Sequence, residues 1–155
     1  MAEMAIVWAV RKHENEMRLE EAEIERHKRF AEDRGAVYWD VKWLCREKVS
    51  TGYLYVSEEK AVTWKVKIEE IITLDELKDR REKEQTYIPN WRMQCLTGLE
   101  NGEPHKTSPT WIKIKEFIRL QNPISPRIMK KWKNKKPINS DYVRRGVYIL
   151  DKDWE

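Results

Sequence analysis

The sequence predicts an α+β fold, in which a curved, mostly antiparallel sheet or open barrel of about six strands is flanked by short helices. Three observations support this prediction. Short segments rich in β-branched and aromatic residues recur along the chain, turn-forming residues separate most of them, and few segments show helical spacing. The length of 155 residues is typical of one domain, so residues 1–155 are expected to fold together.

The N-terminal part of the chain predicts a strand followed by a helix. AIVWAV, at 5–10, is a short apolar run typical of a buried strand. Residues 15–32 favour a helix, with Asn15 as the N-cap and Gly35 as the stop. The apolar positions of this helix recur every seven residues and form a narrow face, so the helix is expected on the surface: Met17, Ile24 and Ala31.

Alternating side chains predict the next three strands. Residues 36–43 (AVYWDVKW) place Trp39 on one face and Tyr38 on the other. Residues 53–57 and 61–72 are expected to pair as an antiparallel hairpin with one wet face. Turns are expected at 51–52 and 58–60.

The second half predicts a mixture of regular and irregular segments. Residues 73–84 have the pattern of a short capped helix, whereas residues 87–109 are typical of a long loop. Residues 111–120 alternate as a strand. The remaining expected elements are a turn at 122–123, a short helix from Pro126 through Lys131 and a strand at 146–150.

Composition argues against several classes of protein. Cys45 and Cys95 are far apart, which excludes a disulfide framework and a C-x-x-C zinc pair and favours a reducing, cytoplasmic compartment. No apolar run approaches the length of a membrane span, and no basic segment precedes the apolar run near the N-terminus. Few glycines among many charged residues are also typical of a thermophile.

Positive charge is concentrated in one segment. The net charge is +4, but residues 106–145 alone carry twelve Lys or Arg and two Asp or Glu. A basic segment that includes an aromatic residue, here Trp132, is typical of nucleic-acid binding, although a solvated flexible loop has the same composition. The residues expected to contact the nucleic-acid backbone are Arg127, Lys130, Lys131, Lys133, Lys135, Lys136 and Arg144.

The sequence offers no catalytic motif. It has no G-x-S-x-G, and His105 stands where a P-loop needs a glycine before Lys106. The acid-x-lysine fragment at 75–78 suits one turn of a surface helix. The three histidines are isolated along the chain, so neither a metal nor another cofactor is expected. We therefore expect a non-catalytic binding domain.

Tryptophan is unusually frequent, with eight residues, which is many for one small core. Aromatic rings stack on bases, and two or three of them enclose a base that has left its helix. Trp91, in the expected loop, and Trp39, just after the first helix, are the strongest candidates for such a pocket. The core is expected to contain Trp8, Tyr55 and Trp64. For Trp43 and Trp111 the pattern does not distinguish the core from the pocket.

Six segments occur in a recognisable order: AIVWAV, GAVYWDV, GYLYVS, AVTWKVKIEEI, WIKIKEFIRLQNPISPRIM and DYVRRGVYIL. This order resembles the EVE group of PUA-like domains, which are relatives of the YTH readers of methylated adenine. Proteins similar to this one occur as N-terminal reader domains of archaeal McrB-like restriction proteins. The resemblance implies a domain that recognises DNA by flipping a modified base, with methylation as the first expectation, into an aromatic pocket.

The resemblance also implies which residues form the pocket. Trp39, with Tyr38 beside it, matches the cage tryptophan after the first helix, and Trp91 matches a second cage aromatic. Trp43 is included as a third aromatic, and Asn15 would read the base edge unless it is only the helix cap. The implied partners are DNA, a GTP-driven motor and a nuclease subunit.

Three alternatives stay open at this level. An RNA-binding PUA-like domain would use the same surface and would add contacts to the 2′-hydroxyl. Some PUA-like relatives are thought to cleave RNA, which would need positioned Lys, Tyr or Thr side chains. A protein-interaction domain would use the basic segment only for solubility.

Overall fold

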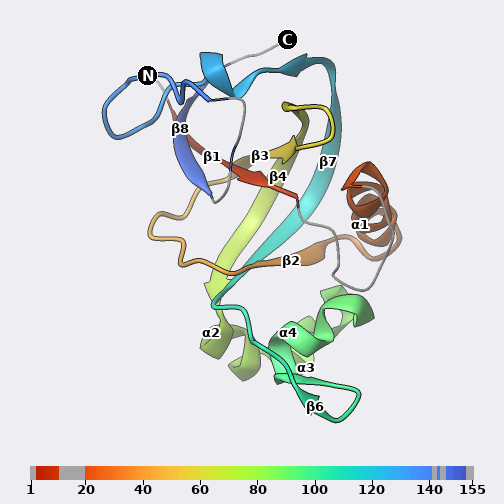
Figure 1. Ribbon diagram of the computed structural model, residues 1–155. Helices are drawn as coiled ribbons and strands as arrows, with labels where there is room; N and C mark the ends of the chain where they lie inside the picture. The colour runs from red at the N-terminus through yellow and green to blue at the C-terminus, as the bar shows by residue number, and fades with distance from the viewer. Residues whose placement is uncertain (1–2, 11–19, 141–142, 144–145, 153–155) are drawn as a thin grey trace.

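The computed structural model describes residues 3–10, 20–140, 143 and 146–152 (Figure 1). Two residues of the expected interface, Asn15 and Arg144, lie outside these ranges. The strands are β1 (Glu3–Ala9), β2 (Val37–Val41), β3 (Thr51–Val56), β4 (Ala61–Thr73), β5 (Leu99–Glu100), β6 (Glu103–Pro104), β7 (Thr110–Ile124) and β8 (Val147–Asp151). The helices are α1 (Glu20–Arg34), α2 (Leu74–Asp79), α3 (Arg81–Glu84) and α4 (Met93–Thr97), with 3₁₀ turns η1 (Gln85–Tyr87), η2 (Asn90–Arg92) and η3 (Pro126–Ile128).

Six strands form one sheet in the order β2-β7-β4-β3-β1-β8. Neighbouring strands are antiparallel except β1 and β3, which are parallel. Within the described residues β2 and β8 end this order without pairing to each other, so the sheet is open and is not a closed barrel. The expected α+β class, with a mostly antiparallel sheet of six strands and a few short helices, is confirmed.

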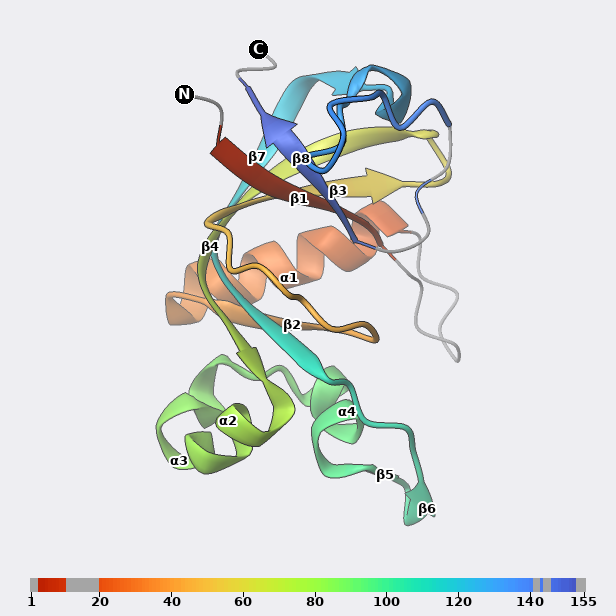
Figure 2. The ribbon, with the colours of Figure 1, turned by 90° about the vertical axis from the view of Figure 1, so that its left-hand side faces the viewer.

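The two longest strands, β4 and β7, run the length of the sheet and bend it. Their pairing shifts register at several points, including one between Val62 and Trp64. Bulges of this kind bend a strand and increase its twist. Figure 2 shows the result, in which β1, β3 and β8 lie at one end of the sheet and α2, α3 and α4 lie at the other. The same shift places Val62 and Trp64 in different core clusters, against the simple alternation expected for this strand.

Three apolar clusters form the core. The largest lies between α1 and the sheet and contains Trp8, Trp39 and Trp64. The second lies under the segment that follows β7 and contains Met129. The third lies where α2 and α4 cover the far end of β4 and β7, and it contains Trp111. The expected burial of Trp8, Tyr55 and Trp64 is confirmed.

The first helix has the expected end. Gly35 adopts a φ of 96° and donates its N–H to the Ala31 carbonyl at 2.7 Å, which closes the last turn of α1. Ile24 and Ala31 of α1 are buried against the sheet. None of the helices in the described part of the chain is long and apolar enough to cross a membrane.

The prediction of a long loop at 87–109 is wrong, because this segment contains η2, α4 and the β5–β6 hairpin. Elements of two to five residues are too short to show a helical or strand period in the sequence. Gly98 ends α4 in the left-handed conformation, with a φ of 77°.

Two expected turns and one expected helix are also wrong. Gly52 lies inside β3, where a Cβ atom would come within 2.7 Å of the Trp8 ring, so the glycine makes room for an indole. Pro123 lies inside β7 at the register shift, where a missing N–H is tolerated. The helix expected from Pro126 to Lys131 is a single 3₁₀ turn that ends at Ile128.

Candidate nucleic-acid interface

Trp39 and Trp91, the two strongest pocket candidates, both contact the side chain of His27 on α1. The His27 imidazole lies 4.2 Å from the Trp39 ring, at an interplanar angle of 33°. It also meets Trp91 edge to face, with ring centroids 5.3 Å apart. The structure therefore brings the two tryptophans together, but the expected space between them is filled by a histidine.

Hydrogen bonds determine the tautomer of His27. Its Nδ1 lies 2.7 Å from the Glu23 carbonyl oxygen, so Nδ1 carries the proton and donates it. Nε2 is then the acceptor of two N–H groups, from Trp91 Nε1 at 3.2 Å and from Arg92 Nε at 2.7 Å. Complete burial and then the Arg92 charge lower the pKa of His27 well below its ordinary value. His27 is therefore neutral and holds the Trp91 indole in place.

Arg92 is the centre of a buried ion-pair network. Its guanidinium contacts the Asp40 carboxylate and lies 3.6 Å from Glu23 Oε1. The Ser108 hydroxyl donates to the second oxygen of Asp40. Burial opposes ionisation of Asp40, but the Arg92 charge and these hydrogen bonds outweigh it and lower the pKa of the carboxyl group. The network fixes Arg92, and through it the segment that carries Trp91.

Trp39 is part of this network. The Arg92 guanidinium lies 4.6 Å from the Trp39 ring centroid, and Trp8 approaches the ring at 6.3 Å. Only 3% of Trp39 is exposed. The Trp39 ring therefore packs against His27 and Arg92, and it is not available to stack on a base in this structure.

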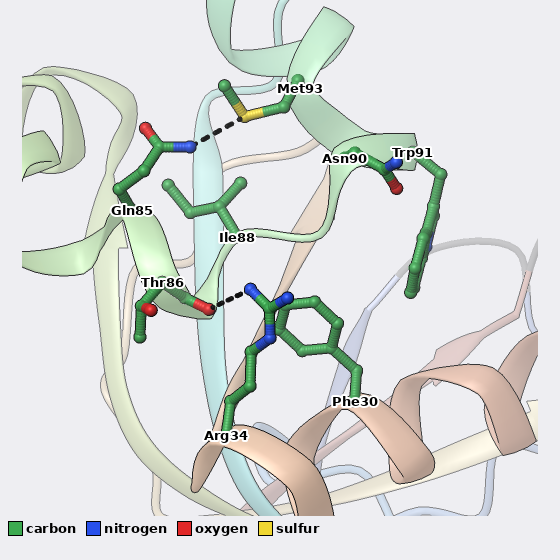
Figure 3. Close-up of a pocket in the computed structure, with 8 residues that line it drawn as sticks. All are labelled: Phe30, Arg34, Gln85, Thr86, Ile88, Asn90, Trp91 and Met93. Atoms are coloured by element: carbon green, nitrogen blue, oxygen red, sulfur yellow. Dashed lines mark hydrogen bonds between the residues drawn. The ribbon is translucent and has the colours of Figure 1, made fainter.

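A cavity of about 480 Å³ opens beside Trp91, between the last turns of α1 and the segment from η1 to α4 (Figure 3). Figure 3 shows the Trp91 indole standing on one side of this space, with Phe30 and Arg34 at its base. The lining residues are Phe30, Arg34, Gln85, Thr86, Ile88, Asn90, Trp91 and Met93. We call this cavity the Trp91 pocket.

The Trp91 pocket combines flat walls with polar groups. The Phe30 and Trp91 rings are 5.7 Å apart and nearly perpendicular. The Arg34 guanidinium lies 4.5 Å from the Phe30 centroid and donates to the Thr86 carbonyl at 3.1 Å. Asn90 contributes an exposed amide, which both donates and accepts hydrogen bonds. Arg34 is the charged residue among those that line the pocket in the described structure, and its positive charge disfavours a cationic ligand.

Two other expected pocket residues lie elsewhere. Tyr38 is completely buried on the face of β2 opposite Trp39, as the alternation predicts, and lies in the cluster that contains Trp111, so its expected role in the pocket is wrong. Adjacent residues of a strand point to opposite faces, and this alternation outweighs closeness in sequence. Burial, reinforced by nearby Glu84, raises the pKa of the Tyr38 hydroxyl. Trp43 is half-buried and packs closely against Gly146, away from the Trp91 pocket.

The basic segment forms an ordered hairpin over residues 129–138, which we call the lysine hairpin. The Ile138 N–H donates to the Met129 carbonyl at 2.8 Å, and the Lys131 N–H donates to the Lys136 carbonyl at 2.9 Å. Its first strand lies along β8, where the Trp132 N–H donates to the Tyr148 carbonyl at 2.9 Å. These residues therefore form a hydrogen-bonded hairpin with exposed lysines, and whether it is flexible in solution stays open.

The lysine hairpin and the Trp91 pocket lie at opposite ends of the molecule. In both Figure 1 and Figure 2 the hairpin is at the top, next to β8, whereas η2 and α4 are at the bottom. Lys130, Lys133, Lys135, Lys136 and Arg127 are exposed, and Lys131 and Trp132 are half-buried. This separation is not predicted from the sequence.

Sequence reasoning also missed His27, Arg92 and Asp40. A usable signal was the spacing Glu23, His27, Phe30 and Arg34, which follows one side of α1 at three- and four-residue intervals. Among the described residues, no group of three or more His, Cys, Asp or Glu side chains is placed to hold a metal ion.

Comparisons with protein-family models, curated proteins and solved structures find no match for this chain.

Proposed function

We propose that this chain is a non-catalytic nucleic-acid-binding domain that holds one flipped, modified base in the Trp91 pocket. On this proposal it is a PUA-like domain of the EVE and YTH type, and it directs a restriction system, with a GTP-driven motor and a nuclease, to modified DNA. The observation that carries the proposal is the pocket beside Trp91, where aromatic walls and amide groups surround one space.

The chemistry of the pocket suits a nucleobase. A base has two apolar faces and a polar edge, and each stacking contact with an aromatic side chain contributes about 1–3 kcal/mol. Trp91 and Phe30 supply aromatic surface, while the Asn90 amide supplies donors and acceptors for a base edge. A methyl group on the base would add apolar contact with Ile88 or Met93.

The pocket is also held ready for a ligand. The indole N–H of Trp91 is bonded to His27, and the Arg26 guanidinium lies 4.4 Å from the Trp91 ring centroid. A wall that is fixed before binding loses little conformational entropy when the ligand arrives. DNA is favoured over RNA because of the resemblance to restriction-protein reader domains.

The test is fluorescence anisotropy at about physiological salt, with matched DNA and RNA duplexes that carry or lack one N6-methyladenine or 5-methylcytosine. We expect methylated DNA to bind at least tenfold more tightly, about 1.4 kcal/mol, than unmethylated DNA. Preference for methylated RNA would indicate the RNA-binding alternative. Equal binding of every probe would overturn the modified-base proposal.

A further inference from the structure

The lysine hairpin carries positive charge that no carboxylate in the described part of the chain neutralises. Among the described residues, none of Lys130, Lys131, Lys133, Lys135 and Lys136 lies within ion-pair distance of an Asp or Glu side chain. Arg92 and Lys113, at the other end of the molecule, each contact two carboxylates. Five like charges within seven positions repel one another, and a polyanion relieves this repulsion.

Hydrogen bonds within the hairpin and to β8 define the arrangement of these charges. Lys135 adopts a φ of 62° at the turn, and its Nζ donates to the Trp132 carbonyl at 2.8 Å. The Asn134 side chain accepts the Lys136 N–H at 3.0 Å. Lys130 is held by β8, because its carbonyl accepts the Leu150 N–H at 2.9 Å. An anion that binds here therefore meets a preformed surface.

Trp132 favours nucleic acid over an acidic peptide as the polyanion. It is half-buried in the middle of the hairpin, with the Lys135 Nζ 4.2 Å from its ring centroid. An indole flanked by lysines provides both stacking and charge, which is the combination that nucleic-acid-binding surfaces use.

The distance between the hairpin and the pocket is set by β7. Ile88 and Met93 of the pocket pack with Trp111, near the start of β7, while Met129 and Ile138 of the hairpin pack with Ile124 at its end. The 15 residues of β7 have a contour of roughly 45 Å at about 3.3 Å per residue, equivalent to about 13 base pairs. The bend in β7 shortens the direct distance, so this contour is an upper limit, and Figures 1 and 2 show the two sites at opposite ends of the sheet.

We propose that the lysine hairpin is a second nucleic-acid contact, separate from the Trp91 pocket, that binds the phosphates of a duplex several nucleotides away from the base in the pocket. This inference rests on the proposed function. It assigns salt-dependent affinity to the hairpin end and base selectivity to the pocket end, and it requires a duplex that extends beyond the flipped base.

The test compares two double variants of the full chain. Lys133→Ala/Lys136→Ala removes two hairpin charges, and Lys48→Ala/Lys78→Ala removes two exposed charges elsewhere as the control. Each is titrated with a 24-base-pair DNA duplex at several salt concentrations and with a trinucleotide, both probes carrying one N6-methyladenine. For the hairpin variant we expect the slope of log affinity against log salt on the duplex to become shallower by about 1.8. Its binding of the trinucleotide is expected to equal that of the wild type.

The outcomes separate this inference from the proposed function. An unchanged slope on the duplex, or an equal change in the control variant, overturns the hairpin contact. A hairpin variant that loses trinucleotide binding as strongly as duplex binding overturns the separation of the two sites. A shallower slope in a protein without preference for the methylated base supports the hairpin contact while the modified-base proposal fails.

Discussion

Positively charged side chains are paired with carboxylates at the pocket end of the molecule and are exposed at the hairpin end. At the pocket end, Arg92 is 13% exposed and is paired with Asp40 and Glu23, and Lys113 is paired with Glu69 and Glu84. At the hairpin end, Lys130, Lys133, Lys135 and Lys136 are exposed and have no carboxylate partner within the described residues. Neutralised charge orients side chains inside the protein, whereas charge that is left uncompensated remains available to an anionic ligand.

The largest effect is expected from breaking the buried network at the pocket end. Arg92→Ala removes the closer of the two cations beside the Asp40 carboxylate, whose side chain is 3% exposed, and leaves it only Lys42, which is 40% exposed and 4.0 Å away. We expect the free energy of unfolding, measured by urea denaturation, to fall by roughly 3–5 kcal/mol. Arg119→Ala is the control, because Arg119 pairs with Glu21 but is 48% exposed, and such pairs contribute about 1 kcal/mol or less. Equal losses in both variants would contradict the account.

Base selectivity is expected to depend on Trp91 at the pocket and not on Trp132 at the hairpin. Trp91→Ala removes a pocket wall and should reduce affinity for a methylated duplex by about 1–3 kcal/mol, with a smaller loss for the unmethylated one. Trp132→Ala should weaken both duplexes by the same factor. Anisotropy titrations with the two probes measure both ratios. Loss of the methyl preference in Trp132→Ala would show that the two ends are not separate.

The stability of the pocket end is expected to depend on pH through His27. The pKa of His27 is lowered in the folded protein, so the unfolded chain binds the proton more readily. The free energy of unfolding therefore falls as pH drops below about 6.5, with a limiting slope of about 1.4 kcal/mol per pH unit from this group. Asp40, whose pKa is also lowered, adds a loss only at more acidic pH, below its unfolded value of about 3.9.

Urea denaturation between pH 7.5 and 5.0 measures this dependence. His27→Gln removes the titrating group, while Gln retains an acceptor for Arg92, so the slope should decrease. Phe30→Leu, which alters the pocket without removing a titratable group, is the control and should leave the slope unchanged. A wild-type slope that persists in His27→Gln would show that another group is responsible.

The smallest effect is expected from neutralising the lysine hairpin. Lys133→Gln/Lys136→Gln removes two exposed charges that have no carboxylate partner in the described structure. The melting temperature at low salt should stay the same or rise slightly, because repulsion within the hairpin decreases. A clear decrease in the melting temperature would show that these lysines stabilise the fold, and it would contradict the account.

Sequence reasoning identified the fold class because strand formation here depends on local alternation. The strands around Trp8, Trp64 and Ile149 are apolar enough to be recognised one by one. The capped helix expected at 73–84 begins with a capping box of Thr73 and Glu76, but it divides into α2 and α3. Register shifts in β4 and β7 were not predictable, because a bulge depends on the partner strand.

The candidate site was predictable only in part. Trp91 was a candidate because it was expected in a long loop outside the core, and the structure places it in η2 beside a cavity. Its partner His27 lies 64 positions away in sequence. A single sequence does not show which distant residues share a buried hydrogen bond. The same limit hid the separation between the lysine hairpin and the pocket, since only the path of β7 places them at opposite ends.

A double-mutant cycle tests the separation of the two ends most directly. Trp91→Ala, Lys133→Ala/Lys136→Ala and their combination are titrated by anisotropy with one methylated 24-base-pair duplex at fixed salt. If the pocket and the hairpin act independently, the losses in binding free energy add within about 0.5 kcal/mol. A coupling of more than about 1 kcal/mol would show that both sets of residues contact the same nucleotides, and it would contradict the account.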